Sequence, residues 1–421
     1  MRGRGKFGFY AVSIFFFISS KTSLADNPRK PQTQDSLQHY VNVINIAVPI
    51  RVFEGDRFVD NLTLRDFDVF EDGIPQEIQA VYLIKKANLE REEKRSEGET
   101  SFKPNTARTF YLFFSMFEPD PKLPDVLAYF FQKVVIPGDH LLVITPRAFY
   151  DLDKDIASQK PVDLIVNDLG KKLRKDILAG DSAYRSVLAD LKKLVGAGGI
   201  DQSLSGNPES AMEDRTKAFG EGTIEEYLMK YHADVDNLEQ LRTIDEAKFL
   251  EFAKALKKLP GQKIVLYFYQ KEFVPIPPRQ IINKLPNNIP MQSLLSELSS
   301  RLNAKSNLNM DRLKKAFADP AISVHFLYVI KNPVDVPNSQ IIERQEIFSA
   351  FDELAKTTGG LSARSQNPLY LLQQAAAAVE NYYLLYYSPK DKTQDGRFRQ
   401  VRVEVKTGNY RISHLAGYIA N

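Results

Sequence analysis

The stretch that most constrains the fold of this chain is the apolar run Thr109-Phe-Tyr-Leu-Phe-Phe-Ser-Met-Phe-Glu-Pro-Asp120. It is short, carries apolar residues on both faces and is bounded by Pro104 and Pro119. Such a run is typical of a parallel strand that helices cover on both sides. Ligands of open parallel sheets bind at the carboxyl ends of the strands, so we expect function to lie after Phe114.

Further apolar runs follow, and segments with helical spacing separate them. The expected strands are His140–Thr145, Lys263–Tyr269 and Ile322–Ile330, with Leu164–Val166 as an edge strand. Helical spacing joins Leu169, Leu173 and Ile177, and a longer helix is expected between Leu241 and Leu259. This alternation of strands and helices predicts an α/β region built on a parallel sheet.

Both ends of the chain have a different pattern. Val41–Val52 alternates apolar and polar residues, and short strands with turn residues follow up to Leu83. After a last helix at 368–380, short strands return from Tyr382 to Ile419. We expect one sandwich, built from an N-terminal β region (26–84) and a C-terminal β region (381–421, packed with 40–84), with the α/β domain (108–380) inserted between them.

Two segments are expected to lie outside these units. Residues 1–25 have a basic start, an apolar run and the small-x-small sequence Ser23-Leu-Ala25, which predict a secretory signal cleaved near Ala25. An uncleaved anchor is the competing interpretation, although the apolar run is short for a bilayer. Residues 85–107 have mixed charge and little to bury, and predict a charged linker.

Composition excludes several classes of function. The chain has 56 basic and 53 acidic residues, and removal of the first 25 residues leaves 52 basic residues against the same 53. A charge near −1 without a basic stripe gives no electrostatic case for binding nucleic acid. The absence of cysteine excludes disulfides, thiolate zinc sites and a cysteine nucleophile. An exported protein without disulfides suits the bacterial periplasm or medium better than an animal extracellular space.

Several short motifs occur in an order that points to one family. They are Asp66-Phe-Asp-Val-Phe-Glu-Asp-Gly73, Pro260-Gly-Gln-Lys-Ile-Val-Leu266, Leu354-Ala-Lys-Thr-Thr-Gly-Gly360, Tyr383-Leu-Leu-Tyr-Tyr387, Asp395-Gly-Arg-Phe-Arg399 and Gly417-Tyr418. Together they resemble bacterial exported proteins related to the von Willebrand factor type A (VWA) domain. The resemblance implies an α/β fold class, with a doubly wound, mostly parallel VWA/Rossmann-like sheet plus a β-sandwich-like region formed by the N- and C-terminal segments.

Complete members of that family hold a divalent cation at a metal-ion-dependent adhesion site (MIDAS). The resemblance implies that the metal ligands would lie at Ser115, Phe117, Pro119 and Gln270, where the family places Asp, Ser, Ser and Asp. Magnesium requires hard oxygen ligands, and these residues supply neither of the two carboxylates. We therefore expect a degenerate MIDAS, with no metal and no cofactor.

The loop after the first buried strand remains the candidate binding site. Its candidate ligand-facing residues are Ser115, Glu118 and Asp120, with Gln270 from the neighbouring strand. Glu118 and Asp120 could provide carboxylates through a shift in register, but no partner ligands are evident, and a solvated acidic loop is the preferred interpretation.

The sequence gives no catalytic constellation. The five histidines, His39, His140, His232, His325 and His414, are scattered, and no acidic pair has the spacing of an acid/base couple. His325 alternates with apolar residues and is expected to be a core residue. Ser205 lacks the strand-turn-helix context of a nucleophile elbow. We therefore expect no enzyme and assign no catalytic residue.

These observations predict an exported, non-enzymatic binding or scaffold protein. It would recognise another protein or an envelope component through a metal-independent VWA-like domain, in the periplasm or outside the cell. No transmembrane segment is expected after cleavage of the signal. Two alternatives remain, a structural envelope subunit that makes contacts through its β region and a hydrolase acting on cell-wall or peptide substrates.

Overall fold

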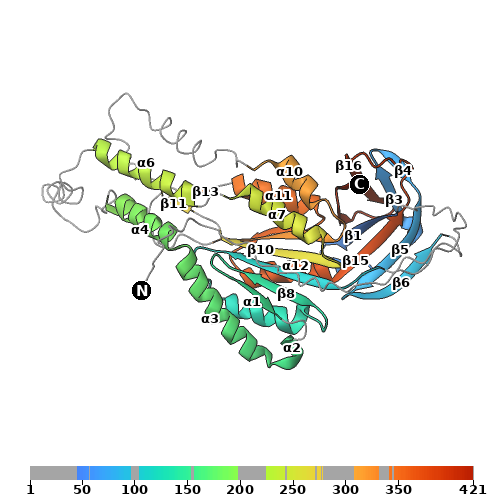
Figure 1. The fold of residues 1–421 in the computed structure, drawn as a ribbon, viewed down its shortest axis with the longest axis horizontal. Coiled ribbons are helices and arrows are strands. Elements are labelled where there is room, and N and C mark those ends of the chain that lie inside the picture. The colour runs from blue at the N-terminus through green and yellow to red at the C-terminus, as the bar shows by residue number, and fades with distance from the viewer. Residues whose placement is uncertain are drawn as a thin grey trace, which may run out of the picture.

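The computed structural model describes residues 45–55, 57–95, 104–152, 156–197, 224–241, 244–270, 273–275, 277, 308–330, 341–343 and 346–420. A mixed sheet with helices lies in the middle of the molecule, curled β structure lies at one end, and two long helices project at the other (Figure 1). The expected signal at residues 1–25 lies outside the described residues.

The central sheet is built from six strands in the order β14-β12-β10-β7-β8-β9. The strands are β7 (Arg108–Ser115), β8 (His140–Ile144), β9 (Phe149–Leu152), β10 (Gln262–Gln270), β12 (Ile322–Val329) and β14 (Ser362–Ser365). Neighbours pair in parallel except at the edge, where β9 runs antiparallel to β8. The strand expected from Thr109 is confirmed as β7.

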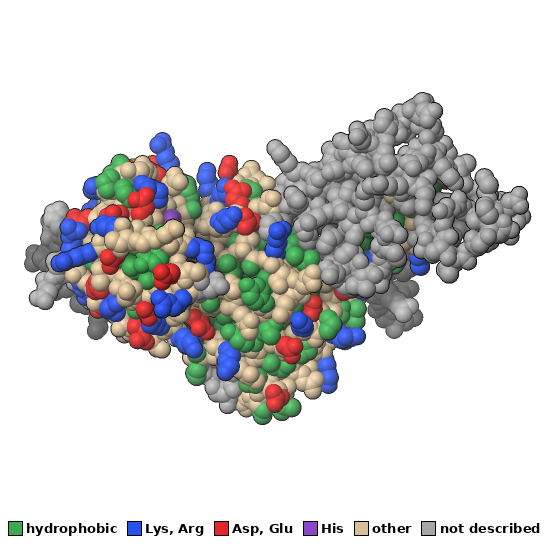
Figure 2. Space-filling view, turned by 180° about the vertical axis from the view of Figure 1, so that it is seen from behind, with side chains coloured by type: hydrophobic (Ala, Val, Ile, Leu, Met, Phe, Trp, Pro, Cys, Tyr) green, Lys and Arg blue, Asp and Glu red, His purple; other side chains and the backbone are tan. Residues whose placement is uncertain are grey.

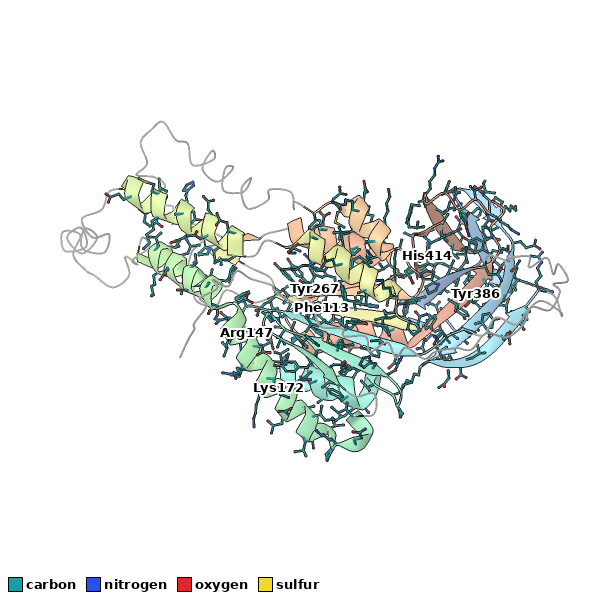
Figure 3. All side chains as sticks on the ribbon, in the orientation of Figure 1. Phe113, Arg147, Lys172, Tyr267, Tyr386 and His414 are labelled. Atoms are coloured by element: carbon teal, nitrogen blue, oxygen red, sulfur yellow. The ribbon has the colours of Figure 1, made fainter. Side chains whose placement is uncertain are left out.

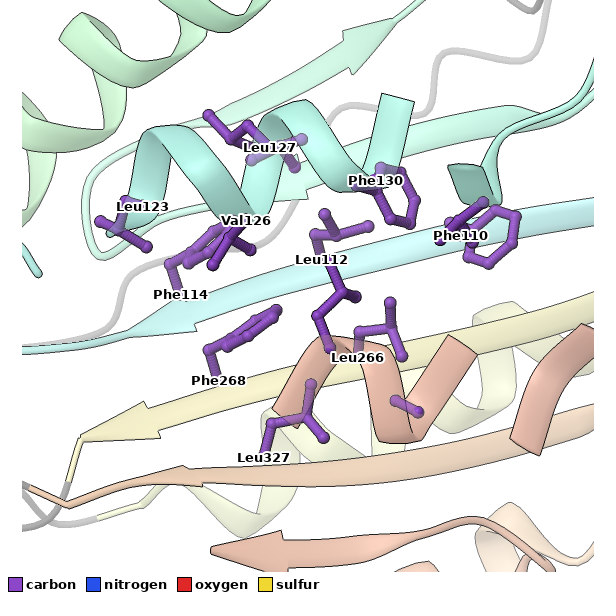
Figure 4. Packing of buried hydrophobic residues seen from close by; sticks show 14 of the residues in the cluster. Phe110, Leu112, Phe114, Leu123, Val126, Leu127, Phe130, Leu266, Phe268 and Leu327 are labelled. Atoms are coloured by element: carbon purple, nitrogen blue, oxygen red, sulfur yellow. The ribbon is translucent and has the colours of Figure 1, made fainter. Parts of the chain in front are cut away.

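Alternate residues of these strands pack into two separate cores. One face places Phe110, Leu112 and Phe114 against helices, and Phe114 stacks on Phe268 at 5.0 Å (Figure 4). The helical elements of this layer are α1 (Leu123–Tyr129), η2 (Phe130–Val134), α2 (Ile156–Gln159), α3 (Val162–Gly180) and α12 (Pro368–Glu380).

The other face of the central sheet is rich in aromatic side chains. Phe113 and Tyr267 project from neighbouring strands toward the same helix layer (Figure 3), and Tyr267 stacks on Phe351 at 5.0 Å. This layer contains α7 (Glu246–Lys257), α10 (Met310–Phe317) and α11 (Glu346–Thr357). Aromatic pairs of this kind add stability beyond the area that they bury.

The terminal segments pair with each other in two antiparallel sheets. The curled sheet has the order β17-β1-β15-β5-β6, with β2 beside β1, and the smaller sheet has the order β18-β16-β3-β4. Their bounds are β1 (Ile46–Glu54), β2 (Arg57–Phe58), β3 (Phe67–Glu71), β4 (Ile74–Gln76), β5 (Ile78–Lys85), β6 (Asn88–Lys94), β15 (Asn381–Tyr387), β16 (Phe398–Val405), β17 (Arg411–His414) and β18 (Gly417–Ile419), with a short helix η1 (Leu64–Asp66) before β3. Apolar residues of both sheets form one core.

The fold class expected from the sequence, a doubly wound and mostly parallel VWA/Rossmann-like sheet with a β-sandwich-like region, is wrong. The structure is mixed, because the central sheet ends in an antiparallel hairpin and a large share of the strands belongs to antiparallel sheets, one of them strongly curled (Figure 1). Apolar runs identify buried strands, but they do not encode strand direction or sheet curvature. The alternation of strands and helices favoured a parallel sheet, and the doubly wound VWA-like topology was implied by the resemblance alone.

Two local predictions are also wrong. Residues 88–94, expected within the charged linker, form strand β6 at the edge of the curled sheet. Its charged residues pair with one another, Arg91 with Glu93 and Lys94 with Glu92, as is usual for an edge strand that must stay soluble. Residues 164–166, expected as an edge strand, lie inside helix α3, because Ile165 continues the helical spacing of the buried residues Leu169 and Leu173.

Two antiparallel helices form an arm that projects beyond the central sheet (Figure 1). They are α4 (Ser182–Ala197) and α6 (Ile224–Leu241), and their facing apolar residues share a small core. A two-stranded ribbon, β11 (Phe273–Pro275) with β13 (Ile341–Glu343), lies near the base of the arm, where the Tyr231 hydroxyl donates to Pro275 O at 3.0 Å.

A buried arginine joins the curled sheet to the central sheet and its helices. Arg51 of β1 is 5% exposed, and its guanidinium donates to Ala378 O in α12 and, at 2.8 Å, to Gly359 O after α11. Burial lowers the pKa of Arg51 to about 10, so the side chain keeps its charge at neutral pH. The charge strengthens both hydrogen bonds to these carbonyl oxygens.

His325 lies near this arginine in strand β12 and is fully buried, as expected for a core residue. Its Nδ1 accepts the N–H of Leu361 at 3.2 Å, and its Nε2 lies 3.3 Å from Ser323 Oγ. Burial, assisted by the positive charge of Arg51, lowers the pKa of His325 to about 3. The folded protein therefore holds this imidazole neutral at all but strongly acidic pH.

This burial predicts a loss of stability in mild acid. Because the pKa of His325 falls from 6.5 in the unfolded chain to about 3 in the folded protein, the unfolded state binds more protons between these values, and stability declines as the pH falls through that window. His325→Asn keeps an acceptor for the Leu361 N–H and removes the titration. Between pH 7 and pH 4.5 we expect this variant to lose about 2 kcal/mol less free energy of unfolding than the wild type.

Urea denaturation at the two pH values measures the difference. Gln373→Asn, at an exposed position of α12 and without a titratable group, serves as the control and should lose as much stability as the wild type. Equal losses in wild type and His325→Asn would contradict the assignment.

Candidate functional site

The loop after β7 lies at the carboxyl edge of the central sheet and leads into α1. It begins at Met116, which is fully buried, and contains Phe117, which is 4% exposed. Glu118 and Asp120 follow and are half-buried. The loop is thus anchored by its first two side chains, whereas the acidic side chains reach the surface.

Gln270 holds this loop against the sheet. It is the last residue of β10, next to the Tyr269–Ser115 pair of the parallel ladder, and is 2% exposed. Its Oε1 accepts the backbone N–H of Phe117 at 3.1 Å and that of Glu118 at 2.9 Å. Gln270 is one of the candidate ligand-facing residues, and the structure directs its amide oxygen to the loop backbone, where it holds the loop in position.

Asp120 also shapes the loop. Its Oδ1 accepts the backbone N–H of Lys122 at 2.8 Å, and its carbonyl oxygen accepts the N–H of Leu123 at 3.1 Å, where α1 begins. This is the usual way in which an aspartate turns a chain into a helix. Ser115 ends β7 and is half-buried. The structure therefore brings Ser115 and Gln270 to neighbouring strand ends and uses Asp120 in the following turn.

These residues do not match the ligand set of a metal-ion-dependent adhesion site. The Phe117 ring lies in the core of the arm, and Gln270 Oε1 already accepts two hydrogen bonds. Among the residues that the structure describes, no group of three or more His, Asp or Glu side chains could hold a metal ion. The side chains at this edge are therefore arranged to hold the loop.

The sequence did not reveal the contacts of Phe117 with the arm. Its ring packs on Tyr184 of α4 at 5.4 Å, and its carbonyl oxygen accepts a hydrogen bond from Arg185 Nη1 at 2.8 Å. Arg185 lies 68 positions further along the chain, and no periodicity links the two segments. The one available signal was an aromatic residue in a polar loop, at a position where the resemblance implied only a lost metal ligand.

A second polar cluster lies on the neighbouring strand. Asp176 of α3 is 8% exposed, and its Oδ2 accepts hydrogen bonds from Thr145 Oγ1 at 2.9 Å and from the Tyr150 hydroxyl at 2.6 Å. Burial and the bond to Asp176 raise the pKa of Tyr150. Both hydroxyl groups belong to the β8–β9 hairpin, so the carboxylate attaches this hairpin to α3. The cluster has a structural role.

Comparisons with known proteins do not assign a family. No protein-family model matches the chain. No curated protein matches it. Among solved structures, the chain is similar to the human COPII-coat protein Sec24c, with a TM-score of 0.33 and 9% sequence identity. The match covers 77% of this chain and 44% of that chain, and a TM-score of this size carries no structural argument.

The bonds to Gln270 predict a specific effect of its loss. Gln270→Met keeps the volume and removes the acceptor, which leaves two backbone N–H groups unpaired. We expect a loss of about 2 kcal/mol in the free energy of unfolding and faster hydrogen exchange at Phe117 and Glu118. Gln374→Met, in the solvent-facing part of α12, is the matched control. Unchanged exchange at the two loop amides would contradict the role of Gln270.

The ligand chemistry predicts the response to divalent cations. Titration with Mg²⁺ or Mn²⁺ is expected to give no saturable heat in calorimetry and no rise in melting temperature, because the loop offers no preorganised set of carboxylates. Saturable binding at a single site would overturn this expectation. It would favour the register in which Glu118 and Asp120 coordinate the ion.

Proposed function

We propose that this protein is an exported, non-enzymatic binding or scaffold protein, and that the loop formed by residues 115–120 recognises its partner. The observation that best supports this proposal is that Gln270 fixes the loop backbone while Glu118 and Asp120 remain at the surface. Binding residues are commonly carried by loops that a rigid scaffold positions. A loop with a fixed backbone loses little entropy when it binds.

The partner proposed is another protein or a component of the cell envelope. On the face seen in Figure 2, basic and acidic side chains of the described residues are interspersed, without a field of one sign. Such a surface gives no electrostatic advantage for nucleic acid. In the part of the chain that the structure describes, no helix has the length and apolar character needed to cross a membrane.

Export and metal independence belong to the same proposal. Export depends on residues 1–25 as a secretory signal, which the sequence alone supports. Metal independence depends on the side chains found at the loop, which hold the backbone and offer no set of carboxylates. The resemblance to VWA-related exported proteins adds a family context and no site residue.

Among the residues that the structure describes, no arrangement of side chains favours a hydrolase. Such an enzyme needs a nucleophile or an acid pair directed at a shared point. At the described carboxyl edge of the sheet, Thr145 and Tyr150 both donate to Asp176, and Gln270 accepts from backbone N–H groups. Their hydrogen-bonding capacity serves to hold secondary structure together.

Site-specific photo-crosslinking in the producing cells tests the proposal. A photoreactive amino acid at position 118 should give a discrete crosslinked species, and Lys258, exposed at the opposite end of β10, provides the control position. Glu118→Lys should reduce recovery of the same partner about tenfold, because it reverses the charge at the proposed interface.

The outcome separates the alternatives. Crosslinks from position 258 and not from position 118 would place the contact elsewhere, as for an envelope subunit that binds through its β region. Equal crosslinking from both positions would also overturn the assignment of the loop.

A further inference from the structure

We propose that the loop after β7 sets the direction of the helical arm formed by α4 and α6, through a latch made of Phe117, Arg185 and Gln270. The arm projects past the end of the central sheet, near the point where this loop leaves β7 (Figure 3). The proposal goes beyond recognition by the loop, because it concerns how the position of the arm depends on the loop.

The arm begins at a break of one residue in a long helical segment. Helix α3 ends at Gly180, Asp181 has φ −102° and ψ 27°, and α4 begins at Ser182. The end of α3 is fixed, because a Cβ on Gly180 would lie 2.4 Å from Pro146 Cβ. Single residues at the ends of elements commonly absorb the backbone changes of a hinge. Asp181 is therefore the expected pivot of the arm.

Arg185 holds the arm across this pivot. Its guanidinium donates to Ile177 O at 3.1 Å and to Leu178 O, both in the last turn of α3, and to Phe117 O at 2.8 Å. A cation at the carboxyl end of a helix is favourable, because the free carbonyl groups there carry partial negative charge. The side chain of Arg185, which belongs to α4, thus connects α4 to the end of α3 and to the loop after β7.

Phe117 connects the loop to the interior of the arm. Although it follows β7 in sequence, its ring belongs to the apolar cluster of the arm, in contact with Tyr184 and together with Leu188, Tyr231 and Val235. Its backbone N–H is bound by Gln270, and its carbonyl oxygen is bound by Arg185. A shift of the loop at residue 117 would therefore break both bonds and carry the ring with it.

These contacts couple the position of the loop to the direction of the arm, so a latched state and a released state would differ in both. In the described state, Gln270 holds the loop on the sheet and the arm is latched. A partner that recognises the loop in this held position would stabilise the latched direction of the arm by its difference in affinity for the two states. That effect rests on the proposed function, whereas the latch itself is a property of the free protein.

Distance measurements between spin labels test the latch. The chain has no cysteine, so pairs of introduced cysteines can be labelled without background. The pair Lys193→Cys and Lys254→Cys reports the distance between the arm and the body, and both positions are exposed. The pair Lys193→Cys and Lys230→Cys reports the distance within the arm.

In the free protein, Phe117→Ala, Arg185→Ala and Gln270→Met should each broaden the arm-to-body distribution or shift its mean by about 5 Å, the scale of one helical turn. The distribution within the arm should remain unchanged, which shows that the arm itself is still folded. Phe130→Ala removes a buried ring that packs on Phe110, near the amino end of β7 and away from the loop, and is the matched control. It should lower the melting temperature without changing either distribution.

Arm-to-body distributions equal to that of the wild type in all three latch variants would overturn the proposal. A change within the arm that accompanies every change between arm and body would also overturn it, because the residues would then serve only to fold the arm. No partner is needed for these measurements. Failure of the latch is thereby distinguished from failure of the crosslinking that tests recognition by the loop.

Discussion

The buried guanidinium of Arg51 is the interaction on which the arrangement of the two β structures depends. It extends from β1 of the curled sheet to carbonyl oxygens at the ends of α11 and α12, the helices that cover opposite faces of the central sheet. A charge in this position is tolerated only because every partner is already in place. The backbone is adapted to it, since Gly359 has φ +69° and a Cβ on Gly360 would lie 1.9 Å from Val324 O. Loss of either glycine would disturb the same joint as loss of the arginine.

The two ends of the central sheet have different tasks. At the amino end, the buried ion pair of Arg108 with Asp139, at 2.6 Å, joins the beginnings of β7 and β8, and Arg51 attaches the curled sheet nearby. At the carboxyl end, the neutral amide of Gln270 and the part-buried guanidinium of Arg185 bind the loop backbone. Leaving a neutral amide or a part-buried cation without its partner costs less than separating a fully buried ion pair, so the carboxyl end is the one that can rearrange at moderate cost. Stability and proposed recognition are thereby placed at opposite edges of one sheet.

The sequence identified the elements far better than it identified their arrangement. The buried strand at 109–114, the buried strands on both sides of it and the core position of His325 followed from apolar patterns, because side-chain burial leaves a direct trace in the sequence. The mixed direction of the central sheet and the strand at 88–94 did not, because direction and edge pairing depend on contacts between distant segments. The same limit applied to the site. Glu118 and Asp120 could be placed on the loop, but the roles of Phe117 and Gln270 required the partners that they meet in three dimensions.

The passage from α12 to β15 has a further consequence. Helix α12 ends at Glu380 and β15 begins at Asn381, so a helix of the central layer continues without a spacer into a strand in the middle of the curled sheet. The strands of the central sheet, β7 to β14, all lie within residues 108–365, whereas the two antiparallel sheets combine strands from residues 46–94 with strands from residues 381–419. The β unit is therefore not encoded as one contiguous segment, and because β15 pairs with both β1 and β5, the curled sheet can be completed only after the whole central unit has been synthesised.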